Sequence, residues 1–254
     1  MPLEYVEGPV AQLHVDDGGA GGLPVVFVHA FAGSASHWDA QLAHLRKHRR
    51  AVAFDLRGHG KIGAAGRRRL RDRIARLRTS RRSSTILACI ASCWWDTASA
   101  APRLSPTPER IRIASRVSCW PGAPGKVPHE QAQKVMSAIE ADFDNAMKPY
   151  WDKLLSGAKP DVRAKIEHDM KTMSKEASLD IIRAAFEFDP LPSLKRYAGP
   201  KLVLYTASGD TPNDLQNLVP TVPHRRIEST SHWMQMDEPE EFNQMLDAFL
   251  AAIR

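Results

Sequence analysis

Three continuous apolar runs mark places along this chain where buried strands are expected. They are Val25–His29, Ala51–Asp55 and Lys201–Thr206, and each ends in small or polar turn residues. Runs of this length without polar alternation are typical of parallel strands that are covered on both faces. The pattern therefore predicts a mostly parallel sheet.

The stretch from residue 126 to residue 197 has a different pattern, in which apolar residues recur every three or four positions. This spacing predicts helices over Gln131–Lys148, Asp161–Thr172 and Leu179–Phe188. Prolines separate these segments, at Pro149, Pro160 and Pro190.

The alternation of strand and helix patterns places the chain in the α/β class. We expect a mostly parallel central sheet flanked by helices, with a helical cap inserted between two parts of the core. These units are the N-terminal part of the core at residues 1–125, the cap at 126–197 and the C-terminal part of the core at 198–254. A chain of 254 residues, 43% of them hydrophobic, is long enough to bury such a core.

Several kinds of protein are disfavoured by composition. No apolar run approaches the roughly 20 residues that span a bilayer, and the first residues lack the features of a signal peptide. The three cysteines, Cys89, Cys93 and Cys119, do not have the spacing of zinc ligands. We therefore expect a cytoplasmic protein that binds no metal and no membrane.

The positive charge of the chain is concentrated in its central segment, residues 62–121. This segment holds thirteen arginines, three acids and no lysine, so it carries ten net positive charges, whereas the whole chain carries +6. Its arginines show neither helical periodicity nor the interleaved aromatic residues of a nucleic-acid-binding surface. We expect no nucleic-acid partner, although an unusual arginine-rich insert stays an alternative.

The genetic code offers another explanation of the central segment. When the codons are regrouped so that each begins at the third base of the original one, Cys93-Trp94-Trp95-Asp96 can encode only Leu-Val-Gly. The next position allows only His or Tyr, and the one after it allows Ser, Cys, Arg or Gly. The positions that follow permit an aliphatic residue or Phe and then two glycines. The regrouped codons can therefore encode Leu-Val-Gly-His-Ser-Leu-Gly-Gly. This peptide contains a Gly-x-Ser-x-Gly pattern that the chain itself lacks.

We infer a reading-frame shift near Ile62 that is compensated near Pro121. The protein that the unshifted frame would encode is called the parent enzyme below. Because the shifted residues were not selected to fold, we expect the segment 62–121 to be irregular and to supply no regular neighbours to the sheet.

Three motifs outside the central segment resemble the α/β-hydrolase superfamily, in its lid-bearing, serine esterase-like branch. They are His29-Ala30-Phe31 after the first apolar run, Asp55-Leu56-Arg57-Gly58-His59-Gly60 after the second, and Ser231-His232-Trp233 before the last helix. The resemblance implies a nucleophile on a strand-to-helix turn, followed in chain order by an acid and a histidine. It also implies a small-molecule ester or acyl substrate and no cofactor.

The resemblance assigns a role to each candidate residue. His232 would act as the general base, and Asp210 would orient it, with Asp214 as the rival acid. The backbone N–H of Phe31, in the turn with Ala30, would stabilise the oxyanion.

No residue of the chain fits the nucleophile well. The regrouped codon for it spans Thr97 and Ala98, and Ser99 is the nearest hydroxyl residue and a weak candidate. Because that codon cannot encode Asp, a serine nucleophile is favoured over the aspartate of haloalkane dehalogenases and epoxide hydrolases. The alternative is that the chain is a catalytically inactive or misfolded relic of such a hydrolase.

Large apolar side chains of the helical stretch could line an acyl pocket. Alternatively, each is simply on the inner face of a packed helix. The set is Phe143, Met147, Tyr150, Trp151, Met170, Met173 and Phe186.

Overall fold

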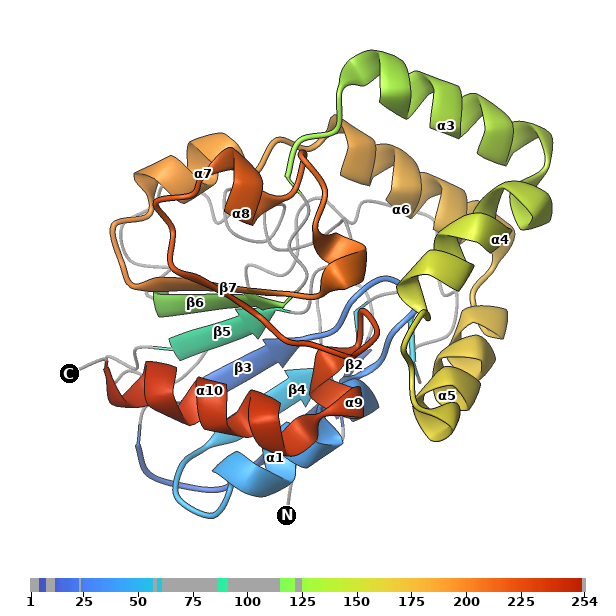
Figure 1. Cartoon of the computed structure of the whole chain (residues 1–254). Helices are drawn as coiled ribbons and strands as arrows, with labels where there is room; N and C mark the ends of the chain where they lie inside the picture. The colour runs from blue at the N-terminus through green and yellow to red at the C-terminus, as the bar shows by residue number, and fades with distance from the viewer. Residues whose placement is uncertain are drawn as a thin grey trace.

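The computed structural model describes residues 5–7, 12–22, 24–56, 59–60, 86–90, 115–121 and 125–252 (Figure 1). Within these residues one eight-stranded sheet forms the centre of the molecule, in the order β1-β2-β4-β3-β5-β6-β7-β8. The strands are β1 (Tyr5–Glu7), β2 (Gln12–Gly18), β3 (Val25–Val28), β4 (Ala51–Phe54), β5 (Ile86–Ile90), β6 (Ser115–Pro121), β7 (Lys201–Tyr205) and β8 (His224–Arg226).

The sheet is parallel from β4 to β8, and β1 and β2 are antiparallel additions at one edge. All three predicted strands are present, as β3, β4 and β7. β7 needs apolar residues on both sides because helices cover both of its faces. The predicted α/β class with a mostly parallel sheet is confirmed.

The expectation that residues 62–121 supply no regular neighbours to the sheet is wrong. β5 pairs in parallel with β3, and β6 pairs in parallel with both β5 and β7. β5 is itself a run of five residues without charge, Ile-Leu-Ala-Cys-Ile, and strand pairing uses backbone groups that every residue carries. The register between β5 and β6 shifts between Ile86 and Ala88. The remainder of 62–121 lies outside the described residues.

One face of the sheet is covered by α1 (Asp39–Leu45), α9 (Met234–Asp237) and α10 (Pro239–Ala251), which lie toward the viewer in Figure 1. Trp38 joins these layers. Its ring stacks on Phe27 of β3 with centroids 4.7 Å apart and lies 5.9 Å from Phe242 of α10. All three side chains are fully buried.

The other face of β7 is covered by α7 (Leu191–Arg196) and α8 (Leu215–Leu218). Leu194, Val203 and Leu215 form a separate apolar cluster there. The described residues also form two short 3₁₀ helices, η1 (Ala35–Trp38) after β3 and η4 (Ala207–Gly209) after β7. η1 contributes buried residues to the core, whereas η4 contributes none.

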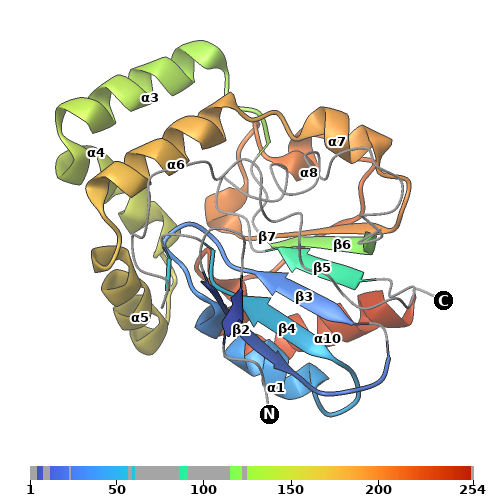
Figure 2. The same cartoon turned by 180° about the vertical axis from the view of Figure 1, so that it is seen from behind.

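A layer of four helices lies beyond the carboxyl ends of the strands (Figures 1 and 2). They are α3 (His129–Ala141), α4 (Phe143–Leu154), α5 (Pro160–Lys171) and α6 (Lys175–Glu187), called the α3–α6 layer below. The last two match the expected helices within a few residues. Met147 is buried in the main core cluster, and the six other large side chains of the expected pocket pack against that cluster.

The first expected helix of this layer, Gln131–Lys148, is in fact two helices. The carboxylate of Asp142 accepts a hydrogen bond from the backbone N–H of Asn145 at 3.3 Å and so begins α4. Pro149, expected to be a break, lies inside α4. An N-cap aspartate within an otherwise helical pattern was the signal for the division.

Candidate active site

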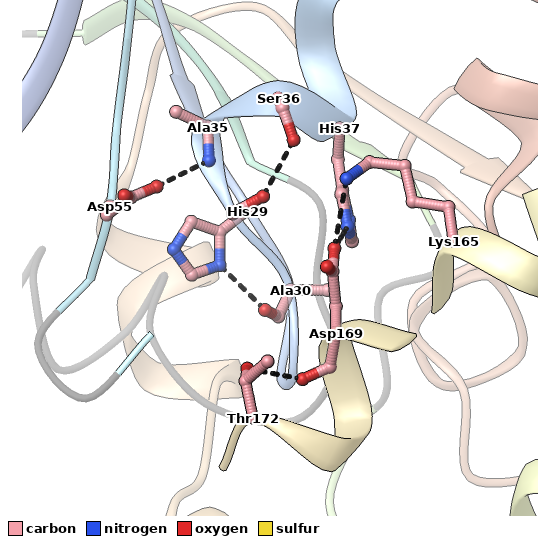
Figure 3. Close-up of polar contacts among 10 residues, drawn as sticks. His29, Ala30, Ala35, Ser36, His37, Asp55, Lys165, Asp169 and Thr172 are labelled. Atoms are coloured by element: carbon pink, nitrogen blue, oxygen red, sulfur yellow. Dashed lines mark hydrogen bonds and ion pairs between the residues drawn. The ribbon is translucent and has the colours of Figure 1, made fainter. Parts of the chain in front are cut away.

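The turn after β3, residues 29–34, is anchored by the buried imidazole of His29 (Figure 3). Its Nδ1–H donates to the carbonyl oxygen of Ala30 at 2.8 Å, and its Nε2 accepts from the backbone N–H of Leu56 at 2.8 Å. An imidazole that donates at one nitrogen and accepts at the other is neutral. The bond to Leu56 also ties the end of β3 to the end of β4.

We expect the free energy of unfolding to fall as the pH is lowered from about 7 to 5. Burial, followed by the nearby His59, lowers the pKa of His29 well below its ordinary value. Burial also lowers the pKa of His37, although the hydrogen bond to Asp169 opposes this. Below about pH 6.5 the unfolded chain binds protons at these histidines that the folded chain does not, which costs up to about 1.4 kcal/mol per pH unit for each.

Urea unfolding between pH 5 and 8 measures this dependence. His29→Gln should be less stable at pH 8 and should show a shallower dependence on pH. His224→Gln, at an exposed position of β8, is the control and should keep the original slope. The same slope in His29→Gln would show that His29 is not the responsible group.

The turn itself is compact and buried. Ala30 and Phe31 are 3% and 6% exposed, and the N–H of Gly33 donates to the carbonyl oxygen of Ala30 at 3.0 Å. Ala32 has a φ of 56°, so the left-handed position of the turn is at Ala32 and not at Ala30. Among the described residues, no acceptor is present for the N–H of Phe31.

Asp55, at the end of β4, fastens the start of η1. Its Oδ1 accepts from the backbone N–H of Ala35 at 2.7 Å (Figure 3). Its Oδ2 lies 3.1 Å from Nδ1 of His14. Gly60, with a φ of 57°, lies directly against this carboxylate and leaves no room for a Cβ. Asp55 and Leu56 therefore connect the end of β4 to the segment that follows β3.

A second contact joins η1 to the α3–α6 layer. Nε2 of His37 lies 2.7 Å from Oδ2 of Asp169 in α5, and Nζ of Lys165 lies 3.2 Å from the same oxygen (Figure 3). Burial works against ionisation of Asp169, but the hydrogen bond from His37 and the charge of Lys165 outweigh it, so the pKa of Asp169 is lowered. The His37–Asp169 pair was not expected from the sequence.

A cavity of about 620 Å³ opens beside this contact. Its described lining includes Ala32 and Gly33 of the turn, Asp55, and Lys165 and Asp169 of α5. Neither His232 nor Asp210 is part of that described lining. The described residues also contain no group of three or more His, Cys, Asp or Glu side chains that could hold a metal ion, and no helix among them has the length and apolar character needed to cross a membrane.

His232 follows β8 in a loop that is buried, although its small hydroxyl residues Ser229, Thr230 and Ser231 favour an exposed loop. His232 is 8% exposed and Ser231 is fully buried. The backbone N–H of His232 donates to the carbonyl oxygen of Leu154 in α4 at 2.9 Å. Of the hydroxyl residues before His232, Ser231 hydrogen-bonds to Asp237 and Thr230 is buried, whereas Ser229 is exposed.

Asp210 and Asp214 both follow β7 and differ in their contacts. Oδ1 of Asp210 accepts from Asn217 at 3.1 Å, and its Oδ2 lies 3.8 Å from Arg226, so neither contact is with His232. Oδ2 of Asp214 accepts from the N–H and the hydroxyl of Thr211, at 2.8 Å and 2.5 Å. Burial raises the pKa of Asp214, although the bonds from Thr211 oppose this. Asp214 is thus held in its own turn, whereas Asp210 is the more exposed acid.

The three residues considered for the nucleophile, Thr97, Ala98 and Ser99, lie outside the described residues. The strand that precedes them is described. Val28 of β3 pairs with Ile90 of β5, so the chain leaves β5 next to the turn that holds Phe31. That is the edge at which a strand-to-helix nucleophile turn is expected.

Comparison with known proteins gives one family match. The model of the "Alpha/beta hydrolase family" matches residues 25–245. No curated protein matches the chain.

Several solved structures have a similar fold. An esterase from Thermogutta terrifontis, with malate bound, is 18% identical, covers 99% of each chain and has a TM-score of 0.70. A variant of AqdC, solved for recognition and ring cleavage of the Pseudomonas quinolone signal, is 14% identical, covers 98% of each chain and has a TM-score of 0.73. The esterase EaEST from Exiguobacterium antarcticum is 14% identical, covers 99% of this chain and 100% of its own, and has a TM-score of 0.69. At these identities the likeness establishes a shared fold.

Proposed function

This chain belongs to the alpha/beta hydrolase family, and we propose that its parent enzyme is a serine hydrolase that cleaves a small ester or a related acyl compound. The observation that supports this most is the arrangement of loops at the carboxyl ends of the strands. A turn with an available N–H follows β3, acids follow β7, and a buried histidine follows β8. This is the chain order of the family's catalytic groups.

In the proposed mechanism the imidazole of His232 accepts the proton of the serine hydroxyl as its oxygen attacks the carbonyl carbon. The N–H of Phe31 donates to the oxygen that becomes negative. His232 then returns the proton to the leaving alcohol, and a water molecule repeats the sequence to release the acid. Asp210 accepts the other imidazole N–H, which requires its carboxylate to turn from Asn217 toward His232.

We propose that the nucleophile is the serine encoded across the codons of Thr97 and Ala98 in the unshifted frame. The position of β5 beside β3 favours this assignment, because the segment that follows Ile90 begins next to Phe31. The competing proposal is an inactive relic. It is favoured by the absence of a Gly-x-Ser-x-Gly motif from the chain and by the contacts of Asp210, which do not include His232.

We also propose that the α3–α6 layer caps the acyl pocket, as part of a cap at residues 126–197 between core parts 1–125 and 198–254. The ring of Trp151 in α4 stacks on Phe31, with centroids 5.5 Å apart and an interplanar angle of 13°. A substrate held by the Phe31 N–H would therefore contact the face of α4 that carries Trp151. A cytoplasmic location and the lack of nucleic-acid and membrane partners stay predictions from the sequence.

Hydrolysis of p-nitrophenyl esters of increasing acyl length tests the proposed function. We expect the parent enzyme, translated from the unshifted frame across residues 62–121, to hydrolyse short acyl esters. The chain as it stands should hydrolyse none above the background rate, because it lacks the serine. A parent enzyme that cleaves neither esters nor lactones would refute the proposal, whereas turnover by the chain as it stands would refute the inferred frame shift.

A further inference from the structure

One buried carboxylate forms hydrogen bonds with the loop that carries His232. It belongs to Asp237 in α9, which is 1% exposed. Its Oδ2 accepts from the backbone N–H of Ser231 at 2.9 Å and from the hydroxyl of Ser231 at 2.5 Å. The hydroxyl oxygen of Ser231 in turn accepts from the N–H of Trp233 at 3.1 Å. The residues on both sides of His232 are therefore fixed by the same carboxylate, one directly and one through Ser231.

The second oxygen of Asp237 reaches a different part of the chain. Oδ1 accepts from the backbone N–H of Lys159, the N-cap residue of α5, at 2.9 Å. The side chain of Lys159 also lies 2.9 Å from Oε1 of Glu238. Asp237 thus joins the histidine loop to the α3–α6 layer by bonds to a backbone N–H on each side.

The turn between α4 and α5, residues 154–159, packs against the same loop. Leu154 accepts the hydrogen bond from the N–H of His232. Gly157 has a φ of 83°, and a Cβ there would lie 3.2 Å from the carbonyl group of Thr230. The positive φ favours glycine here, and a Cβ would make this backbone contact tighter than an ordinary one.

The same two helices contact the turn on the other side of the site. α4 stacks Trp151 on Phe31, and α5 bonds Asp169 to His37. The relative positions of Phe31 and His232 are therefore set through α4 and α5 as well as through the sheet.

We infer that Asp237 is a positioning residue for His232, and that it acts by clamping the loop 229–233 to the α4–α5 turn. This inference rests on the proposed role of His232 as a base. Asp237 touches no reacting atom. Its effect is to keep the imidazole at a constant place relative to the Phe31 N–H, and it makes the base of the α3–α6 layer a fixed part of the site.

Asp237→Asn tests the clamp, because an amide keeps the size of the side chain but cannot accept all three bonds. One oxygen can still accept from Lys159 or from Ser231, and the NH₂ group then faces a donor. Asp247→Asn is the matched control, because Asp247 lies in α10 on the same side of the molecule and, among the described residues, pairs with His44 alone.

The readouts are hydrogen exchange of backbone amides and the rate at which diethyl pyrocarbonate modifies His232, both on the chain as it stands. In Asp237→Asn we expect exchange at Lys159, Ser231 and His232 to quicken by about 10-fold or more, and modification of His232 to quicken several-fold. Exchange in β7 and α10 should stay within about 2-fold. The control should change neither quantity.

Uniformly faster exchange across α10 and β7 would overturn the inference, because Asp237 would then stabilise only the fold. Rates of amide exchange and of His232 modification in Asp237→Asn that both stay within about 2-fold of those in the original chain would overturn the inference as well. If Asp237→Asn does not fold, the same measurements are made on Ser231→Ala. It removes only the hydroxyl, and the inference requires a smaller loosening confined to the same amides.

In the parent enzyme, Asp237→Asn should lower kcat by about 10-fold or more and leave KM within about 2-fold, because the base is misplaced while the acyl pocket is intact. Exchange and chemical modification need no turnover. A parent enzyme without esterase activity would therefore count against the proposed function and leave the test of the clamp standing.

Discussion

Replacing His232 by alanine should lower kcat/KM of the parent enzyme for short acyl esters by about 10⁴-fold. No other described side chain stands in the loop after β8 with a nitrogen able to accept the serine proton. Because the Phe31 N–H remains, a residual rate above that in water should persist. The measurement is steady-state hydrolysis together with urea unfolding of the same variant, so that loss of activity is separated from loss of fold.

His224→Ala is the matched control for this prediction. His224 lies in β8, is exposed, and bonds only to the carbonyl oxygen of Val222 among the described residues. Its replacement should leave kcat/KM within about 2-fold. Equal losses in the two variants would show that His232 is not the base.

A similar comparison separates the two acids. Asp210→Asn should lower kcat by about 10³-fold or more, because an amide cannot stabilise the imidazolium. Asp214→Asn should lower it by less than about 10-fold, because Asp214 is bound to Thr211 in its own turn. The reverse order would assign the role to Asp214.

The second large effect concerns stability. Trp38→Ala should lower the free energy of unfolding by about 3–5 kcal/mol, because it leaves a cavity between β3 and α10 where the ring contacts Phe27 and Phe242. A loss of that size is a large part of the total stability of an ordinary domain. Urea unfolding at neutral pH measures it.

Trp151→Ala is the control for Trp38→Ala. Trp151 is only half-buried and contacts Phe31 and Tyr150 in the α3–α6 layer, so its loss should cost less than about 2 kcal/mol. A cost for Trp151 as large as that for Trp38 would contradict the expectation that the fully buried ring contributes more to the free energy of unfolding than the half-buried one.

Patterns in the sequence were sufficient for the elements with a strong apolar period. β3, β4 and β7 are short apolar runs, and α5 and α6 have a clear helical spacing. β8 could not be found in this way, because His224–Arg226 is an exposed, charged segment that enters the sheet only by pairing with β7. β5 was hidden for another reason. Its five apolar residues lie within the segment 62–121, and the inferred frame shift led us to expect no regular strand there.

The candidate site divides along similar lines. Phe31 and His232 are recognisable from local motifs, because each motif is contiguous in the chain. The contacts that position these residues join parts of the chain that are far apart in the sequence. His37 and Asp169 are 132 residues apart, and Asp237 reaches 78 residues back to Lys159. Without knowledge of which helices meet, no pattern along the sequence indicates such a pair.

The central claim is that the parent enzyme carries a serine nucleophile, encoded across the codons of Thr97 and Ala98, that His232 activates. Labelling with a fluorophosphonate, followed by peptide mass spectrometry, tests it most directly. We predict one labelled serine in the parent enzyme, at that position, no labelling after His232→Ala, and no labelling of the chain as it stands. A label on Ser99 of the chain as it stands, or a parent enzyme that remains unlabelled while folded, would contradict the claim.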